Sequence, residues 1–434
     1  QHQRRQGSNM ATSASQASGE DTAPVQAAAP AAAEPTRQAE PAAAAARPRR
    51  GIEAIAKLER GEVVPKRGSI PRWETDTAAF CERAELQSSA SVSGRVRGET
   101  RVYAMSDLHA DRDDNREFLN ELVERRRREQ PDNKDVLIVA GDVSEDPELL
   151  LDTVQMLRTA FGAGVVFVPG NHDLWRGRKD DARFKDSAKK LHYLLRECEA
   201  RGVSTSALHV EAAELWVVPL HSWHHQSWDR EPSIAGIKLP PLELCMSDYH
   251  NCQWPTAAMN DPKSDAVALY MDELNDAIVE RVHEGRREGE TCITCSHFLP
   301  HQELMPTKRM LFLPELPKAC GSDLLRPRID EIGDVSAHVF GHTHFCWDQK
   351  VDDVRFLSCP LAYPNERKMN MNGGGDWVPL AIWDSAPAVE RWCPEQPAFW
   401  STWYKTNGRD PSNMELAPWV EKRWGKRRVE VAAN

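Results

Sequence analysis

Five short polar blocks place the strongest constraint on the fold of this 434-residue chain, because each directly follows a run of apolar, largely β-branched residues. In chain order the blocks are Ser106-Asp107-Leu108-His109, Gly141-Asp142-Val143, Gly170-Asn171-His172-Asp173, Ser296-His297 and Gly341-His342-Thr343-His344. Short apolar runs of this kind predict buried strands. Loops at the ends of such strands are held by a rigid sheet and often carry functional side chains. We therefore expect the polar side chains of the five blocks to form one functional site.

The residue types within the blocks predict metal binding. Asp107 and His109 are two residues apart, as are His342 and His344. In an extended chain, residues at this spacing point to the same side, so each pair can share one ion. Asp, Asn and His side chains without a thiolate suit Mn, Fe or Zn, and the sequence does not select among these metals.

The block set resembles the calcineurin-like metallophosphoesterase family, whose motifs read D-x-H, G-D, G-N-H-D/E, H and G-H-T-H, over roughly residues 100–385. The resemblance implies a first metal ion held by Asp107, His109, Asp142 and His344. It implies a second ion held by Asp142, Asn171, His297 and His342, so that Asp142 bridges the two. It also implies that His172 donates a proton to the leaving group.

The chemistry of such a pair of ions explains the expected activity. Two cations about 3.5–4 Å apart stabilise the attacking and leaving oxygens of an in-line displacement. They also lower the pKa of bound water, so that a hydroxide shared by the ions attacks near neutral pH. We therefore expect hydrolysis of a phosphomonoester or a phosphodiester.

Two departures from the family pattern bear on the substrate. Many members carry an Asp that orients the catalytic His three residues after the second-block Asp, where this chain has Glu145, with Asp146 as the competing candidate. Protein Ser/Thr phosphatases of the family carry arginines where this chain has Asp146 and Pro169. A small-molecule or nucleotide phosphoester is therefore favoured. The alternatives are a phosphoprotein phosphatase with an atypical phosphate clamp and a metal-binding scaffold without turnover.

Residues 221–262 interrupt the core between a predicted strand and a predicted helix at 264–284, and we interpret them as a cap over the metal site. His224 and His225 in this segment are candidates for substrate binding, together with Arg309 and Arg367. Packing within the loop is the alternative for the two histidines, and a simply solvated side chain is the alternative for the two arginines. The sequence near the cap and the last block resembles an uncharacterised plant and algal subgroup of the family.

The resemblance implies an α/β fold, a four-layer αββα sandwich of two mixed β-sheets flanked by helices, over residues 99–385. Residues 1–50 are rich in Ala and Pro, which predicts a disordered tail. Residues 51–98 are an N-terminal extension, and residues 386–434 are a Trp-rich extension expected to fold over the core. Apolar spacing predicts helices at 114–129, 147–161 and 181–200.

Composition narrows the class of protein and its compartment. The net charge of −11 argues against a nucleic-acid scaffold, which is normally basic. No apolar stretch approaches the roughly 18 residues that span a bilayer, so we expect a soluble protein whose partner is a phosphoester substrate. Ten cysteines without a secretory segment predict reduced thiols inside the cell, with the cytoplasm favoured and an organelle such as the chloroplast as the alternative.

Overall fold

The computed structural model describes residues 100–177, 180, 182–368, 378–386, 391–395 and 398–427. All of them belong to the second of two compact units, which comprises residues 48–434. The predictions for residues 1–50 and 51–98 lie outside the described residues.

The first sheet has four strands in the order β10-β1-β2-β3. They are β1 (Arg101–Met105), β2 (Val136–Val139), β3 (Gly164–Phe167) and β10 (Leu380–Asp384). Strands β1, β2 and β3 are parallel, and β10 pairs antiparallel with β1. Parallel strands end at the same edge of a sheet, so the first three polar blocks come together there.

The second sheet has six strands in the order β4-β5-β6-β7-β9-β8. They are β4 (Leu208–Val210), β5 (Leu215–Pro219), β6 (Thr291–Cys295), β7 (Val335–Phe340), β8 (Trp347–Val351) and β9 (Val354–Ser358). The four central strands are parallel, and β4 and β8 pair antiparallel at the edges. Both sheets are therefore mixed.

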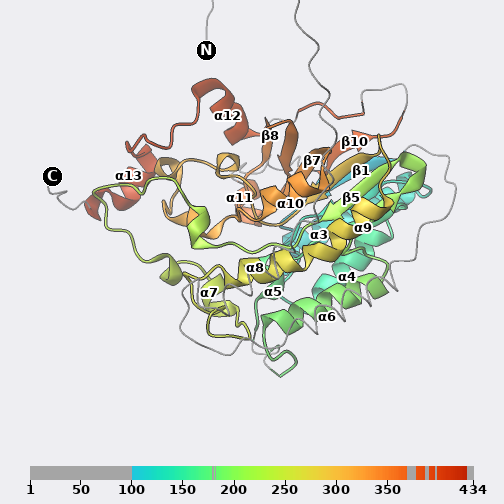
Figure 1. Ribbon diagram of the computed structural model, residues 1–434, viewed down its shortest axis with the longest axis horizontal. Coiled ribbons are helices and arrows are strands. Elements are labelled where there is room, and N and C mark those ends of the chain that lie inside the picture. The colour runs from blue at the N-terminus through green and yellow to red at the C-terminus, as the bar shows by residue number, and fades with distance from the viewer. Residues whose placement is uncertain are drawn as a thin grey trace, which may run out of the picture. The chain divides into compact units, whose positions relative to one another are not determined.

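Side chains along a strand point alternately to the two faces of its sheet, and this explains how the sheets and helices form layers. In β2, Val136 and Ile138 belong to a buried cluster with residues of the second sheet, such as Ile293. Leu137 and Val139 point the other way, into the larger cluster that includes helix residues. Each sheet is therefore covered on both faces, one by the other sheet and one by helices (Figure 1).

The longer helices are α3 (Asp113–Glu129), α4 (Pro147–Arg158), α6 (Ser187–Ala200), α8 (Ala266–Glu273), α9 (Asn275–Gly285), α10 (Leu325–Ile332) and α12 (Phe399–Asn407). Helix α4 packs on β3, α9 on β5 and α10 on β7. The predicted four-layer sandwich is confirmed.

Three helix predictions were wrong in part. The helix predicted at 147–161 ends at Arg158. The helix predicted at 181–200 begins at Ser187, because the Asp186 carboxylate caps it by accepting the Lys189 backbone N–H at 2.8 Å. The helix predicted at 264–284 is two helices, α8 and α9, which meet at Leu274.

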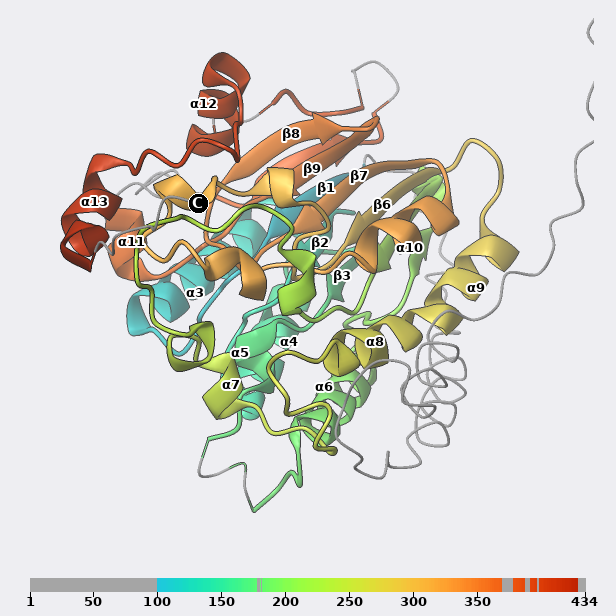
Figure 2. The same ribbon diagram turned by 60° about the vertical axis from the view of Figure 1, so that its left-hand side comes forward.

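The short elements are α5 (Asn171–Leu174), α7 (Asp248–Asn251), α11 (Pro364–Lys368), α13 (Pro418–Trp424) and the 3₁₀ turns Glu211–Ala213, Gln226–Trp228, Leu242–Leu244, Gln302–Leu304, Lys308–Met310, Leu316–Ala319 and Gly425–Arg427. In both views α7, from the predicted cap segment, lies beside α5 (Figures 1 and 2).

In the C-terminal segment, the indole N–H of Trp424 donates to the Phe312 carbonyl at 2.6 Å. Among the described residues, no helix combines the length and apolar character needed to cross a membrane.

Candidate metal centre

The five blocks meet at the carboxyl ends of strands from both sheets. Oxygen or ring-nitrogen atoms from four of the predicted ligands lie within 4.8 Å of one another, and these residues are Asp107, His109, Asp142 and His344. A second group within the same limit consists of Asp142, His297 and His342. The Asn171 side-chain oxygen lies 3.0 Å from both His297 Nε2 and His342 Nδ1, so it completes the second group. The structure thus brings all seven predicted metal ligands together.

The donor set fits cations. The ring nitrogens His109 Nε2 and His344 Nε2 face each other at 3.0 Å. Within the described part of the chain, neither Asp107 nor Asp142 pairs with a Lys or an Arg, although both are buried. Their ion-pair partners are instead His297 and His344, and a buried carboxylate is costly unless positive charge lies beside it. Two ions bound on either side of Asp142 would supply it.

The backbone of these loops is unusual. Five of the predicted ligands have positive φ angles: Asp107 (53°), His109 (41°), Asp142 (56°), His342 (74°) and His344 (58°). Left-handed conformations cost non-glycine residues about 1–2 kcal/mol each. Strain of this kind gathers at functional sites, where surrounding hydrogen bonds hold it in place. Here the His342 backbone N–H donates to Asp107 Oδ1 at 2.9 Å, and the His109 N–H donates to the Asp142 carbonyl at 2.9 Å.

Glycines in the blocks leave room for the ligands. A Cβ atom at Gly170 would overlap the Asp142 carboxylate, and a Cβ atom at Gly141 would overlap the His297 ring. Gly141 also has a φ of +83°, which a side chain would disfavour. These positions therefore need glycine for close approach.

Each of three ligand histidines donates one ring N–H to an oxygen acceptor. His297 Nδ1 donates to the Ala140 carbonyl at 2.8 Å, and His342 Nε2 donates to the Ala319 carbonyl at 2.8 Å. His344 Nδ1 donates to Glu366 Oε2 at 2.7 Å. These bonds fix the ring tautomers and leave the opposite nitrogens free to bind metal.

The comparisons with known proteins agree with this geometry. Residues 100–346 match the calcineurin-like phosphoesterase family. The chain belongs to this family. It is 36% identical over 292 residues to the [acyl-carrier-protein] phosphodiesterase PptH of Mycobacterium tuberculosis, with 62% of this chain and 80% of that protein covered. The predicted enzyme class, a metal-dependent phosphoester hydrolase, is confirmed, whereas the likeness to a plant and algal subgroup stays a prediction.

Two solved structures resemble this phosphoesterase more distantly. Phosphopantetheinyl hydrolase (PptH) from Mycobacterium tuberculosis has 23% identity and a TM-score of 0.48, covering 68% of this chain and 99% of that chain. A putative 5′-nucleotidase from Staphylococcus aureus has 14% identity and a TM-score of 0.31, covering 60% of this chain and 48% of that chain. The family assignment rests on the sequence matches.

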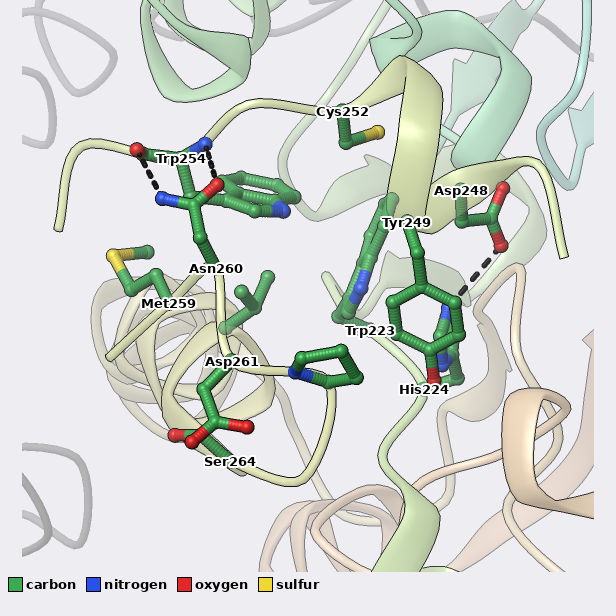
Figure 3. Close-up of a pocket in the computed structure, with 12 residues that line it drawn as sticks. Trp223, His224, Asp248, Tyr249, Cys252, Trp254, Met259, Asn260, Asp261 and Ser264 are labelled. Carbon is green, nitrogen blue, oxygen red and sulfur yellow. Dashed lines mark hydrogen bonds and ion pairs between the residues drawn. The ribbon is translucent and has the colours of Figure 1, made fainter. Parts of the chain in front are cut away.

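Asp248, from α7 in the predicted cap, orients Asn171. One of its carboxylate oxygens accepts hydrogen bonds from Asn171 Nδ2 at 2.8 Å and from Trp175 Nε1 at 2.7 Å. The other lies 3.1 Å from His224 Nε2, and Figure 3 shows this pair at the side of a hollow lined by Trp223 and Tyr249. Burial alone would raise the pKa of Asp248, but these bonds lower it to about 2. The anion therefore holds the Asn171 oxygen toward His297 and His342.

Asp173 joins the second and third blocks. Its carboxylate accepts four backbone N–H groups, and their donors are Gly170 at 2.8 Å, Asp142 at 2.9 Å, Val143 at 2.8 Å and Ser144 at 3.1 Å. Asp173 belongs to a sequence motif, but the sequence predicts no role for it, and neither Asp248 nor Glu366 is among the residues predicted from sequence. No motif marks the latter two, since ordinary carboxylates on distant segments resemble surface residues.

His172 lies at the edge of the site, where its ring centroid is 4.9 Å from that of the ligand His109. Its side chain is 13% exposed, and its Nδ1 lies 3.5 Å from Glu145 Oε1. The hydrogen bond with His172 lowers the pKa of Glu145. Asp146, the competing candidate, instead caps α4 by accepting the Glu148 and Leu149 backbone N–H groups. Glu145 is therefore the acidic group in position to orient His172.

The four predicted substrate-binding residues have other contacts in the described part of the chain. His224 pairs with Asp248, and His225 lies between Asp265 at 3.5 Å and Asp323 at 3.2 Å. The Arg309 side chain donates to the Glu415 carbonyl, whereas Arg367 donates to Asn115 Oδ1 at 2.5 Å. Their roles toward substrate stay predictions.

Proposed function

We propose that this phosphoesterase cleaves a phosphodiester on an acyl carrier protein and releases a phosphopantetheinyl group. The observation that carries the proposal is the 36% identity to an [acyl-carrier-protein] phosphodiesterase, which this chain covers over 80% of its length. The family match over residues 100–346 separately contains all five ligand blocks. A small-molecule or nucleotide phosphoester, which the sequence favours, stays the alternative prediction for the substrate.

Accessibility at the edge of the site supports a large substrate. Glu145, which contacts His172, is 48% exposed, and Arg112 at the start of α3 is 53% exposed. A folded partner can therefore bring an ester on its surface to His172 without first entering a closed cavity.

We assign roles to the ligand residues as follows. Asp107, His109, Asp142 and His344 would hold one ion, and Asp142, Asn171, His297 and His342 would hold the other. When bound, the ions supply an activated water and offset the charge on the phosphoryl oxygens. This set of Asp, Asn and His donors suits Mn, Fe and Zn.

His172 and Glu145 act on the leaving group. The Glu145 carboxylate lies 3.5 Å from Nδ1 and acts as the acceptor for the Nδ1–H group, which leaves Nε2 of the imidazolium as the ring nitrogen with a proton to give. As the bond between phosphorus and the leaving oxygen breaks, that proton passes to the departing alkoxide. Nδ1 keeps its proton and its bond to Glu145, and the ring is left neutral.

Arg112 and Tyr363 are better placed for substrate binding than the four residues predicted from sequence. The Tyr363 ring stacks on the ligand His109 with centroids 4.3 Å apart. The Arg112 guanidinium lies 5.3 Å from the Tyr363 ring centroid. It is thus an exposed cation next to the ligand group, and we assign it to binding a phosphoryl oxygen.

The test uses the full chain loaded with Mn²⁺, with Asp142→Asn as the blank. Intact mass of a carrier protein bearing phosphopantetheine should fall by the mass of that group, and bis-p-nitrophenyl phosphate should be cleaved faster than p-nitrophenyl phosphate. No mass change above the blank, or faster cleavage of the monoester, would reject the proposal. Preferential cleavage of phosphopeptides would instead favour the phosphoprotein phosphatase.

A further inference from the structure

We infer that Lys190 is a positioning residue for His172, an inference that rests on the proposed role of His172 as proton donor. Lys190 lies on α6, outside all five blocks, in the amphipathic run Ser187–Ala200. Its side chain has 0% exposure, which is unusual for a lysine. A buried ammonium ion is costly unless it is fully bonded, so its partners indicate what it does.

Three acceptors surround the Lys190 ammonium group. It donates to the Glu145 carbonyl at 2.6 Å and to the Trp175 carbonyl at 2.5 Å. It also pairs with Asp180 Oδ2 at 3.2 Å. An ammonium group has three donors, so each donor has a partner.

The two carbonyls belong to the residues that hold the His172 ring. Glu145 lies in the loop after β2, and its carboxylate contacts His172 Nδ1 at 3.5 Å. Trp175 directly follows α5, and its ring packs on the imidazole with centroids 3.6 Å apart. The Lys190 ammonium group therefore links, through hydrogen bonds, the Glu145 loop and the Trp175 segment, which contact the His172 ring from two sides.

A second contact from the same helix face acts on the same turn. The Ser187 hydroxyl donates to the Leu174 carbonyl at 3.0 Å, and Ser187 lies three residues before Lys190. Residues three apart on a helix are neighbours, so the first turn of α6 holds the chain directly after His172 at two points. Only the Lys190 contact extends to the Glu145 loop.

The experiment separates proton donation from general stability by changing the leaving group. A series of aryl methyl phosphodiesters runs from p-nitrophenol, which leaves readily as the anion, to p-methoxyphenol, which needs a proton. Loss of a general acid typically costs 10²–10⁴-fold, and the cost should fall mainly on the second kind of leaving group. We expect Lys190→Met to lower kcat by about tenfold or more for p-methoxyphenol esters and by less than about twofold for p-nitrophenol esters, with KM little changed.

Matched variants complete the design. Lys189→Met removes the same charge from the exposed neighbour on α6 and should leave the series unchanged. His172→Ala should show the same leaving-group pattern as Lys190→Met, and the double variant should be no worse than His172→Ala alone, since both act through one group. Should Lys190→Met fail to fold because Asp180 is left unpaired, Lys190→Met with Asp180→Asn removes the charge as a pair.

Two readouts besides turnover test the assignment. Bound metal should equal that of the wild type, and amide hydrogen exchange should quicken in the segments around Glu145 and Trp175. An equal loss for all leaving groups, a fall in bound metal, additivity with His172→Ala, or no effect at all would overturn the role of Lys190. Absence of a leaving-group effect in His172→Ala would instead reject the proton-donor role of His172, and the Lys190 inference with it.

Discussion

The ligand loops and the residues that support them are held in different ways. Five ligands, including Asp107 and His342, have left-handed backbones in loops at strand ends. The supporting residues Asp248, Glu366 and Lys190 lie on helices or short turns, and none of them has a positive φ. The ligand loops therefore carry backbone strain and buried negative charge that bound cations would offset, whereas the supporting residues act through hydrogen bonds and ion pairs.

Substitutions in the two regions should therefore have different consequences. A change in the loops should abolish metal binding, because the ligand groups are few and each is needed. A change among the supporting residues should weaken metal binding or proton transfer by degrees, since partners of metal ligands typically contribute 10–100-fold. The predictions below test that ranking.

The largest effect is expected for Asp142→Asn, because Asp142 belongs to both ligand groups. Loss of one charge-stabilising group typically costs 10²–10³-fold in kcat, so loss of the shared ligand should exceed about 10³-fold. Elemental analysis should find less than one ion per chain. Retention of two ions with full activity would show that the shared carboxylate is not needed.

Gly170→Ala should come next. The added Cβ would overlap the Asp142 carboxylate and its backbone nitrogen, and overpacking in a buried site costs about 1–3 kcal/mol. We expect a lower Tm and a fall in bound metal. Gly177→Ala is the matched control, since nothing lies within 4 Å of the added carbon. Equal effects of the two would mean that close approach at Gly170 does not matter.

Asp248→Asn tests a supporting residue directly. The Asn amide can still accept one hydrogen bond from Asn171 or Trp175, but it can no longer form the ion pair with His224. Metal affinity should fall about 10–100-fold, less than for a ligand. Asp261→Asn changes an exposed carboxylate on the rim of the same hollow and should leave affinity unchanged. A loss of metal affinity as large as that of Asp142→Asn would show that the supporting residues matter as much as the ligand loops.

The same distinction explains what the sequence could predict. The ligands were found because metal chemistry restricts them to a few residue types at fixed spacings, as in His342-Thr343-His344. The two mixed sheets followed from family resemblance and from apolar runs. Asp248 and Lys190 were not found, because an Asp in a loop and a Lys on an amphipathic helix look solvated in sequence. Only the packing of α6 and α7 against α5 places them at the site.

Arg112→Gln should have a smaller effect, on substrate rather than on metal. KM for bis-p-nitrophenyl phosphate should rise about tenfold, because a hydrogen bond to a charged group is worth about 1.5–3 kcal/mol and this one is partly exposed. Arg309→Gln is the matched control and should change KM little, since its side chain is bonded to the Glu415 carbonyl. A larger rise in KM for Arg309→Gln than for Arg112→Gln would instead support Arg309 as the substrate-binding residue.

His225 gives the smallest expected effect on activity and a distinct one on stability. Burial alone would lower its pKa, but Asp265 and Asp323 raise it to about 9. A pKa above the unfolded value of about 6.5 stabilises the fold fully below pH 6.5, and that contribution is lost as pH rises through 9. Urea unfolding should therefore show a free energy that declines between about pH 6.5 and pH 9.5 and a weaker decline in His225→Asn, with bound metal unchanged at neutral pH. An unaltered pH dependence in the variant would mean that this pairing contributes no stability. A loss of metal would place His225 among the residues that support the ligands.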